Sequence, residues 1–174
     1  VLADGYRYML AHLNREIEEL TLRGDARFPE FFRSVDMLRK WTAENPDAMY
    51  LNAPIDASGY YEVTISARNT QEWRDNIAQV AGEKAPRLVT FQTITAVPGY
   101  TGELQEMATC VSQTLDFTNS FSLQADRAGA YKILIGPEKP KGYNGNFLHS
   151  RKELECQTTG ITAMVDAKLL SVRE

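Results

Sequence analysis

The stretch Ser120–Pro140, SFSLQADRAGAYKILIGPEKP, decides the fold class of this chain. Apolar and polar residues alternate along it on both sides of a short turn that contains glycine. The apolar residues of this pattern are Phe121 and Leu123 before the turn and Tyr131, Ile133 and Ile135 after it. Alternation with a period of two is typical of β-strands, and prolines end such strands. The stretch therefore predicts two antiparallel strands joined by a tight loop and stopped by Pro137 and Pro140.

Other segments of the second half have the same character. Strands are predicted at Tyr61–Ile65 and within 87–97, 107–117 and 160–172. Residues 49–56 are expected to be extended, with Pro54 confining them to a sheet edge because proline has no N–H to donate. Residues 72–81 are ambiguous, since their apolar side chains also have helical spacing. Short strands separated by Gly and Pro predict an antiparallel β-sandwich or jelly-roll-like body over residues 50–174.

A helical leader is predicted over residues 1–42. An apolar stripe recurs every three or four residues, and Gly24 is a natural stop. The stripe consists of Leu2, Tyr6, Met9, Leu13, Ile17 and Leu20. We expect this amphipathic helix to pack on the β body, and it could also pair with another subunit in a homo-oligomer. A second short helix is predicted within residues 28–41, and the whole chain is expected to form one domain.

Composition narrows the classes of partner. The chain has 174 residues, a net charge of −4 and a pI near 5.3. Without a basic run it lacks the electrostatic footprint that holds a phosphate backbone, so no nucleic-acid partner is expected. No apolar run approaches the roughly 20 residues that cross a bilayer, so no membrane span is expected. The beginning of the chain also lacks the apolar core of a signal peptide, and the cytoplasm is the predicted location.

The two cysteines, Cys110 and Cys156, both fall in or beside predicted strands. A chain of this length can bury an adequate core without a covalent link. We therefore expect two buried thiols in preference to a disulfide.

Motifs for catalysis, metals and cofactors are not found in the sequence. The two histidines, His12 and His149, belong to no paired metal-ligand spacing, and His12 is expected to be a solvated helix residue. No nucleophile elbow and no phosphate-binding loop are found either. We expect no metal and no cofactor, and the sequence leaves open whether the protein is an enzyme.

Two polar groups of residues remain as candidate sites. The candidate ligand-binding residues are Asn45, Asp47, Tyr50, Asn52 and Asp56 in the first group, and Tyr143, Asn146 and His149 in the second. Tyrosine rings and oriented amides at the rim of a sandwich suit a sugar or another small polar molecule. We favour the plainer interpretation, a turn and a Gly-rich surface loop, and keep the ligand site as the hypothesis to test. Glu62, Asp116 and Glu153 are a weaker candidate for paired-carboxylate hydrolysis.

Three motifs give the chain a family resemblance. They are Asp4-Gly5-Tyr6-Arg7-Tyr8, then Glu44-Asn45-Pro46-Asp47-Ala48-Met49-Tyr50 continuing to Tyr60-Tyr61, and finally the strand from Ala130 that runs through Gly136-Pro137-Glu138-Lys139-Pro140 to Gly145-Asn146-Phe147-Leu148. In this order they resemble bacterial proteins that contain domain of unknown function 1214. The resemblance implies a jelly-roll-like β-sandwich with no established reaction and no catalytic residues.

The predicted function is the binding of a small polar ligand or of another subunit. The alternative is an enzyme that acts on a carbohydrate or small organic molecule. That alternative needs residues 45–56 and 141–149 to meet over one concave pocket.

Overall fold

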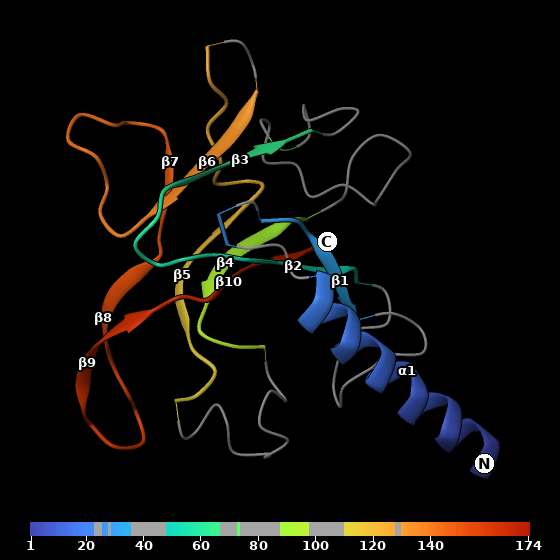
Figure 1. The fold of residues 1–174 in the computed structure, drawn as a ribbon. Coiled ribbons are helices and arrows are strands. Elements are labelled where there is room, and N and C mark those ends of the chain that lie inside the picture. The colour runs from blue at the N-terminus through green and yellow to red at the C-terminus, as the bar shows by residue number, and fades with distance from the viewer. Residues whose placement is uncertain are drawn as a thin grey trace.

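The computed structural model describes residues 1–22, 26–27, 29–35, 48–66, 73, 88–97, 110–127 and 130–174. Within these residues the chain forms one α-helix and ten β-strands (Figure 1). The helix is α1 (Leu2–Leu22), and the strands are β1 (Phe32–Val35), β2 (Tyr50–Pro54), β3 (Tyr61–Ile65), β4 (Thr90–Ile94), β5 (Thr114–Asn119), β6 (Tyr131–Gly136), β7 (Asn146–His149), β8 (Arg151–Glu155), β9 (Thr162–Asp166) and β10 (Leu169–Arg173).

The strands form three sheets. A five-stranded sheet has the order β1-β2-β10-β4-β5, a three-stranded sheet has the order β3-β6-β7, and β8 and β9 form a two-stranded arm. Neighbouring strands are antiparallel except for the parallel pair β6 and β7. The mainly β, sandwich-type architecture predicted from the sequence is therefore confirmed.

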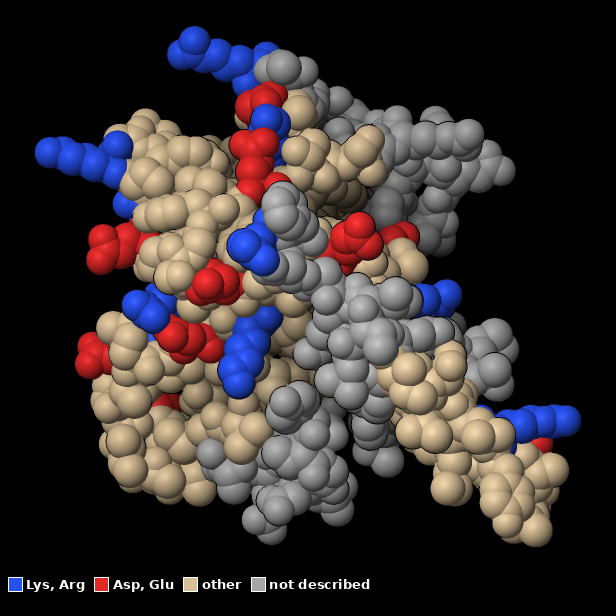
Figure 2. Space-filling view, in the orientation of Figure 1, with Lys and Arg blue, Asp and Glu red and all other residues tan. Residues whose placement is uncertain are grey.

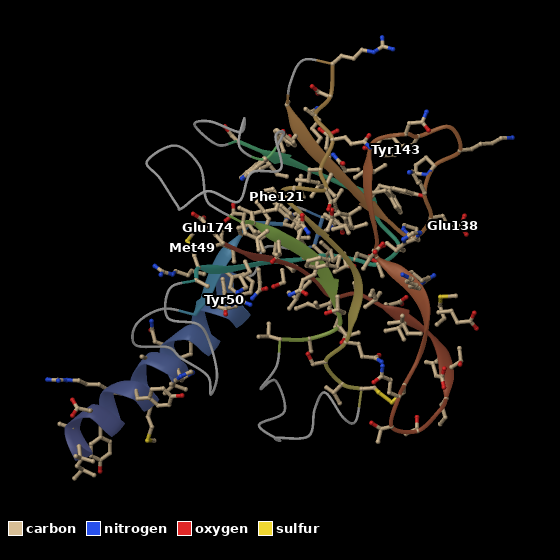
Figure 3. The ribbon with its side chains drawn as sticks, turned by 180° about the vertical axis from the view of Figure 1, so that it is seen from behind. Met49, Tyr50, Phe121, Glu138, Tyr143 and Glu174 are labelled. Carbon is tan, nitrogen blue, oxygen red and sulfur yellow. A yellow bond between two sulfur atoms is a disulfide. The ribbon has the colours of Figure 1, made fainter. Side chains whose placement is uncertain are left out.

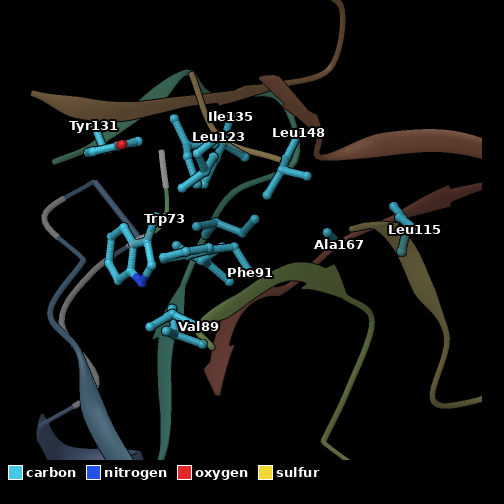
Figure 4. Packing of buried hydrophobic residues seen from close by; sticks show 13 residues of the cluster. Trp73, Val89, Phe91, Leu115, Leu123, Tyr131, Ile135, Leu148 and Ala167 are labelled. Carbon is cyan, nitrogen blue, oxygen red and sulfur yellow. The ribbon is translucent and has the colours of Figure 1, made fainter. Parts of the chain in front are cut away.

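The hydrophobic core lies between the five-stranded and the three-stranded sheets (Figure 4). Phe91, Leu170 and Val172 come from the larger sheet, and Ile133 and Ile135 come from the smaller. Burying each side chain of this kind stabilises the fold by about 1.5–3 kcal/mol. The inward-pointing half of each alternating strand thus holds the two sheets together.

The predicted hairpin within Ser120–Pro140 is wrong in its first arm. β6 pairs with β3 and β7, and the segment before it contributes only an isolated bridge between Ala125 and Tyr131. The Asn119 carboxamide accepts hydrogen bonds from two following backbone N–H groups, which turns the chain out of β5. The Asn146 side chain accepts a hydrogen bond from the Gln124 N–H and donates one to the Gln124 carbonyl. These bonds take the place of the backbone hydrogen bonds that a neighbouring strand would make with Gln124.

Three other expectations about strands need correction. Residues Phe32–Val35 are a strand rather than part of a short helix, because pairing with β2 overrides the local helical spacing. Strand β2 is not at an edge. Pro54 is tolerated because it lies beyond the residues of β2 that pair with β1. The single strand expected within 160–172 is two strands, β9 and β10.

The ambiguous segment 72–81 lies outside the described residues except for Trp73, which packs edge-on against Tyr131.

Helix α1 forms as predicted, but the stripe residues whose side chains the structure describes do not pack on the sheets. The side chains of Leu2, Tyr6, Met9, Leu13 and Ile17 are between 50 and 74% exposed. The helix extends away from the sheets, with its N-terminus at the far end (Figure 1). In the part of the chain that the structure describes, no helix is long and apolar enough to cross a membrane.

The expectation of two buried thiols is wrong. Cys110 and Cys156 form a disulfide, and both residues are only half-buried. Cys156 lies at the distal end of the β8–β9 arm, where its N–H donates to the Ile161 carbonyl. Cys110 lies just before β5, so the bond fastens the end of the arm to the larger sheet. The alternation of the sequence could not reveal this proximity, because the two residues are 46 positions apart.

Candidate functional site

A cavity of about 600 Å³ lies between the two large sheets. This volume is within the range of sites that hold small organic molecules. Its walls come from both sheets and from the chain that leads into β1. The lining residues are Arg27, Pro29, Glu30, Phe31, Ala53, Ile55, Tyr60, Tyr61, Glu62, Val63, Thr64, Ile135 and Leu170.

The position of the cavity follows from how the sheets meet. Its lining includes β3, the end strand of the smaller sheet, and the residues that lead into β1, the end strand of the larger sheet. On the opposite side β5 contacts β7, and polar bonds join the two sheets there. The sheets are therefore pinned together on the β5–β7 side, and the cavity lies on the β1–β3 side.

Two glycines set the positions of the cavity tyrosines. A Cβ atom on Gly136 would lie 2.4 Å from the Tyr60 ring, so this ring rests directly on the backbone of β6. A Cβ atom on Gly59 would lie 3.1 Å from the Tyr61 hydroxyl oxygen. The absence of side chains at both positions lets the aromatic rings approach the backbone closely.

The two tyrosine hydroxyls make different hydrogen bonds. The Tyr60 O–H donates to the Glu138 carbonyl at 3.0 Å. The Tyr61 oxygen instead accepts the Asp56 N–H at 2.8 Å. Ile55 and Tyr60 both line the cavity, so one end of it lies beside the turn between them, which contains Asp56. Tyr61 is thus held at this end through its oxygen.

Charges around the cavity are balanced. Arg27 and Glu30 are exposed lining residues of opposite sign. Glu62 accepts a hydrogen bond from the Lys132 ammonium at 2.9 Å. That hydrogen bond, together with the charge of Glu62, raises the pKa of Lys132. On the face shown in Figure 2, acidic and basic side chains are interspersed.

The first group of predicted site residues does not converge. Asn45 and Asp47 lie outside the described residues. Tyr50 lies under the Arg173 guanidinium, 5.3 Å from it. Asn52 is only 2% exposed and belongs to the face of β2 opposite the cavity residue Ala53, and its Oδ1 has no hydrogen-bond partner among the described residues. Asp56 accepts hydrogen bonds from the Ser58 backbone and hydroxyl, which lower the pKa of its carboxyl group.

The second group is closer together and mostly structural. The Asn146 amide donates to the Lys132 carbonyl at 2.8 Å and also bonds Gln124, so it links three segments of backbone. The Tyr143 hydroxyl donates to the Asn146 carbonyl at 3.2 Å. These contacts order the loop between β6 and β7. Because these side chains already form hydrogen bonds with the backbone, few of their donors and acceptors remain available to a ligand.

His149 is bound to Asp116, a contact that connects the two sheets. The Asp116 carboxylate lies 2.7 Å from His149 Nδ1 and accepts the His149 backbone N–H at 3.0 Å. The pKa of Asp116 is lowered overall. Burial is the largest single effect and acts to raise it, but the hydrogen bonds from the His149 backbone and ring and from Phe117, together with the charge of Lys152, outweigh burial. The His149 side chain is 39% exposed, and the Phe147 ring meets it edge-on.

The two predicted groups therefore occupy different parts of the molecule. Tyr50 begins a strand of the larger sheet, while Tyr143 lies in a loop of the smaller sheet, and the two are well separated in Figure 3. The cavity between the sheets is lined by Ala53 and Ile55 from the first segment and by none of residues 141–149. Glu62 and Glu153 also lie on different sheets from Asp116. No group of three or more His, Cys, Asp or Glu side chains in the described ranges is placed to hold a metal ion.

Sequence reasoning missed the cavity tyrosines. The sequence places Tyr61 in a predicted strand and in a family motif, and Tyr60 in that motif alone, and it predicts a ligand contact for neither. The available signal was Gly59-Tyr60-Tyr61, a glycine followed by two aromatic residues at the start of a strand. Such a pattern indicates a close approach of a ring to the backbone, but it cannot show that the facing sheet leaves space.

Comparison with known proteins yields a structural neighbour and no protein of known function. No protein-family model matches the chain, and no curated protein matches it. A solved structure, that of an uncharacterised protein from Burkholderia cenocepacia, matches with a TM-score of 0.63 and 20% sequence identity. The match covers 98% of this chain and 36% of that chain, so the present chain corresponds to about a third of its neighbour. At this identity the likeness shows the fold alone, and membership of the family with domain of unknown function 1214 stays a prediction.

Proposed function

We propose that this protein is a binding protein that takes a small organic molecule into the cavity between its two sheets. The observation that carries the proposal is the cavity itself, about 600 Å³ in volume and lined from both sheets. Apolar concave sites with a few polar groups are the usual form of ligand sites. The proposal gives the chain no catalytic step.

The walls favour a ligand with a largely apolar body. The accessible apolar surface of the lining comes from Phe31, which is exposed, and from the half-buried Val63, while Ile55, Ile135 and Leu170 lie behind them in the core. Apolar contact contributes roughly 25 cal/mol for each Å² removed from water. The balanced charges of Arg27 and Glu30 favour a ligand without net charge. We therefore place the polar part of the ligand, which the sequence led us to expect, at the tyrosine end of the cavity.

Equilibrium dialysis with 2-acetylnaphthalene, an apolar aromatic ketone, tests the proposal. We expect saturable binding of one molecule to each chain. Val63→Phe fills the cavity and should abolish binding while circular dichroism stays that of the wild type. Ile161→Phe introduces the same ring on the exposed loop before β9, away from the cavity, and should leave binding unchanged. Failure of the wild-type protein to bind, or equal loss in both variants, would overturn the proposal.

Self-association through α1 is a second candidate function, and a separate observation favours it. The stripe from Leu2 to Ile17 is exposed along one face of a 21-residue helix. Contiguous exposed apolar surface of this kind is characteristic of interaction sites. Pairing of two such helices would bury the stripe, and the mass of the protein in solution measures it.

A further inference from the structure

Among the residues that line the cavity, Tyr61 carries a hydrogen-bond donor that the described protein groups leave unused. The Tyr61 oxygen accepts the Asp56 N–H, and no acceptor among the described residues takes the Tyr61 O–H proton. The neighbouring Tyr60 differs, because its O–H already donates to the Glu138 carbonyl. A tyrosine hydroxyl can both accept and donate a hydrogen bond, so the O–H group of Tyr61 remains available to donate to a ligand.

The surroundings of Tyr61 hold its hydroxyl in one place. The Asp56 N–H fixes the oxygen at 2.8 Å, and Gly59 leaves just enough room for it. Tyr61 also belongs to β3, which pairs with β6 along its whole length, so the backbone that carries it is held by the sheet. A donor held in this way needs little reorganisation to bind a ligand.

We infer that Tyr61 selects the ligand by donating a hydrogen bond to an uncharged oxygen acceptor, such as a ketone, ester or amide carbonyl, on an otherwise apolar molecule. This inference rests on the proposed function of the cavity. The acceptor is uncharged because Arg27 and Glu30 offset each other at the cavity and Glu62 is bound to Lys132. A carboxylate ligand would need an unbalanced cation, and the described lining does not provide one.

Two probes of the same shape isolate this hydrogen bond. 2-Acetylnaphthalene carries a carbonyl oxygen where 2-isopropenylnaphthalene carries a CH₂ group. We measure the affinities of both by equilibrium dialysis against the wild type, Tyr61→Phe and Tyr60→Phe. The quantity of interest is the ratio of ketone affinity to alkene affinity, in which the contribution of apolar contact cancels.

Tyr61→Phe should lower this ratio about 2- to 10-fold, as loss of one neutral hydrogen bond implies. Tyr60→Phe is the matched control and should leave the ratio unchanged, since that hydroxyl is already bonded to the protein. If both compounds bind the wild type and Tyr61→Phe leaves the ratio unchanged, the inference is overturned while the proposed function stands. If neither compound binds the wild type, the proposed function itself fails.

A second variant guards against an effect of Tyr61→Phe on folding. Gly59→Ala keeps the hydroxyl but places a Cβ atom 3.1 Å from its oxygen, so the oxygen must move by a few tenths of an ångström. The ratio should fall in this variant as well. An unchanged ratio in folded Gly59→Ala, as judged by circular dichroism, would count against a positioned donor.

Discussion

Asp116 on β5 holds His149 on β7 by two hydrogen bonds, 2.7 Å to the ring nitrogen Nδ1 and 3.0 Å from the backbone N–H. A third bond, from the Thr93 hydroxyl to the His149 carbonyl at 2.6 Å, comes from the neighbouring strand β4. The larger sheet therefore binds the backbone of His149 on both sides, as well as its ring. These bonds explain why the sandwich is pinned on the β5–β7 side. His149, which the sequence suggested as a ligand-binding residue, has a structural partner.

The Asp116 contact predicts a stability that depends on pH. The folded protein lowers the pKa of this carboxyl group below its ordinary value of 3.8. A lowered pKa means that the stabilisation is complete above the unfolded value and is lost as the pH falls through the folded value. We expect the free energy of unfolding to fall from about pH 4 downwards. Urea denaturation at a series of pH values measures it.

Asp116→Asn separates this effect from the other carboxylates. The variant should be less stable by about 2 kcal/mol at neutral pH, because hydrogen bonds to a charged acceptor are lost. The difference between wild type and variant should shrink as the pH falls below 4, since protonation removes the same charge. Glu153→Gln on the exposed face of β8 is the control and should change stability little. A difference that stays constant with pH would show that the charge of Asp116 contributes nothing.

The disulfide predicts a large effect of reduction on stability. Cys110 and Cys156 are 46 residues apart, and closing a loop of this length in the unfolded chain is worth about 4 kcal/mol in the chain-entropy model. We expect reductant to lower the midpoint of guanidinium denaturation clearly. The double variant Cys110→Ser, Cys156→Ser should be equally destabilised and should not respond to reductant. An unchanged midpoint in the reduced wild type would contradict the expectation.

The same bond bears on where the protein is found. The sequence predicts a cytoplasmic location, and a disulfide is unusual in that compartment. Disulfides that stabilise a fold persist mainly in oxidising compartments. We therefore expect denatured protein, purified without reductant from its natural source, to show no free thiol with Ellman's reagent. Two free thiols per chain in that assay would support the cytoplasmic prediction instead.

The sequence determined the strands better than it determined their partners. Alternation in Tyr131–Gly136 and Tyr61–Ile65 reflects burial of one face, which is a local property, and both strands form. The pairing of β6 with β3 instead of with residues 121–125 depends on side-chain bonds from Asn119 and Asn146, which act across distant segments. The same limit applies to the site. Asn52 and Tyr143 have suitable chemistry, but their place in the sandwich depends on register and sheet order, which a single sequence does not state.

The exposed stripe of α1 predicts that the protein associates. Leu13 is 58% exposed in the middle of the stripe, and a charge there would be costly inside a helix pair. We expect light scattering coupled to size-exclusion chromatography to give a mass above that of one chain, and Leu13→Asp to lower it. Ala3→Asp adds the same charge to an exposed residue outside the stripe and should leave the mass unchanged. A wild-type mass of one chain at working concentration would rule out this association.

The contact between Gly136 and Tyr60 predicts a coupling between the two residues. A Cβ atom at position 136 would lie 2.4 Å from the Tyr60 ring, so Gly136→Ala must displace the ring or the strand. Overpacking of this kind typically costs about 1–3 kcal/mol. Because the ring is the obstacle, the same substitution should cost much less in a Tyr60→Ala background. Denaturation of the four proteins of this double-mutant cycle gives the coupling energy directly.

Gly5→Ala is the control for this cycle. Its new Cβ atom meets no atom within 4 Å, so its effect on stability should be additive with that of Tyr60→Ala. If Gly136→Ala is additive too, Tyr60 does not rest on β6, and this wall of the cavity is formed by something other than its ring.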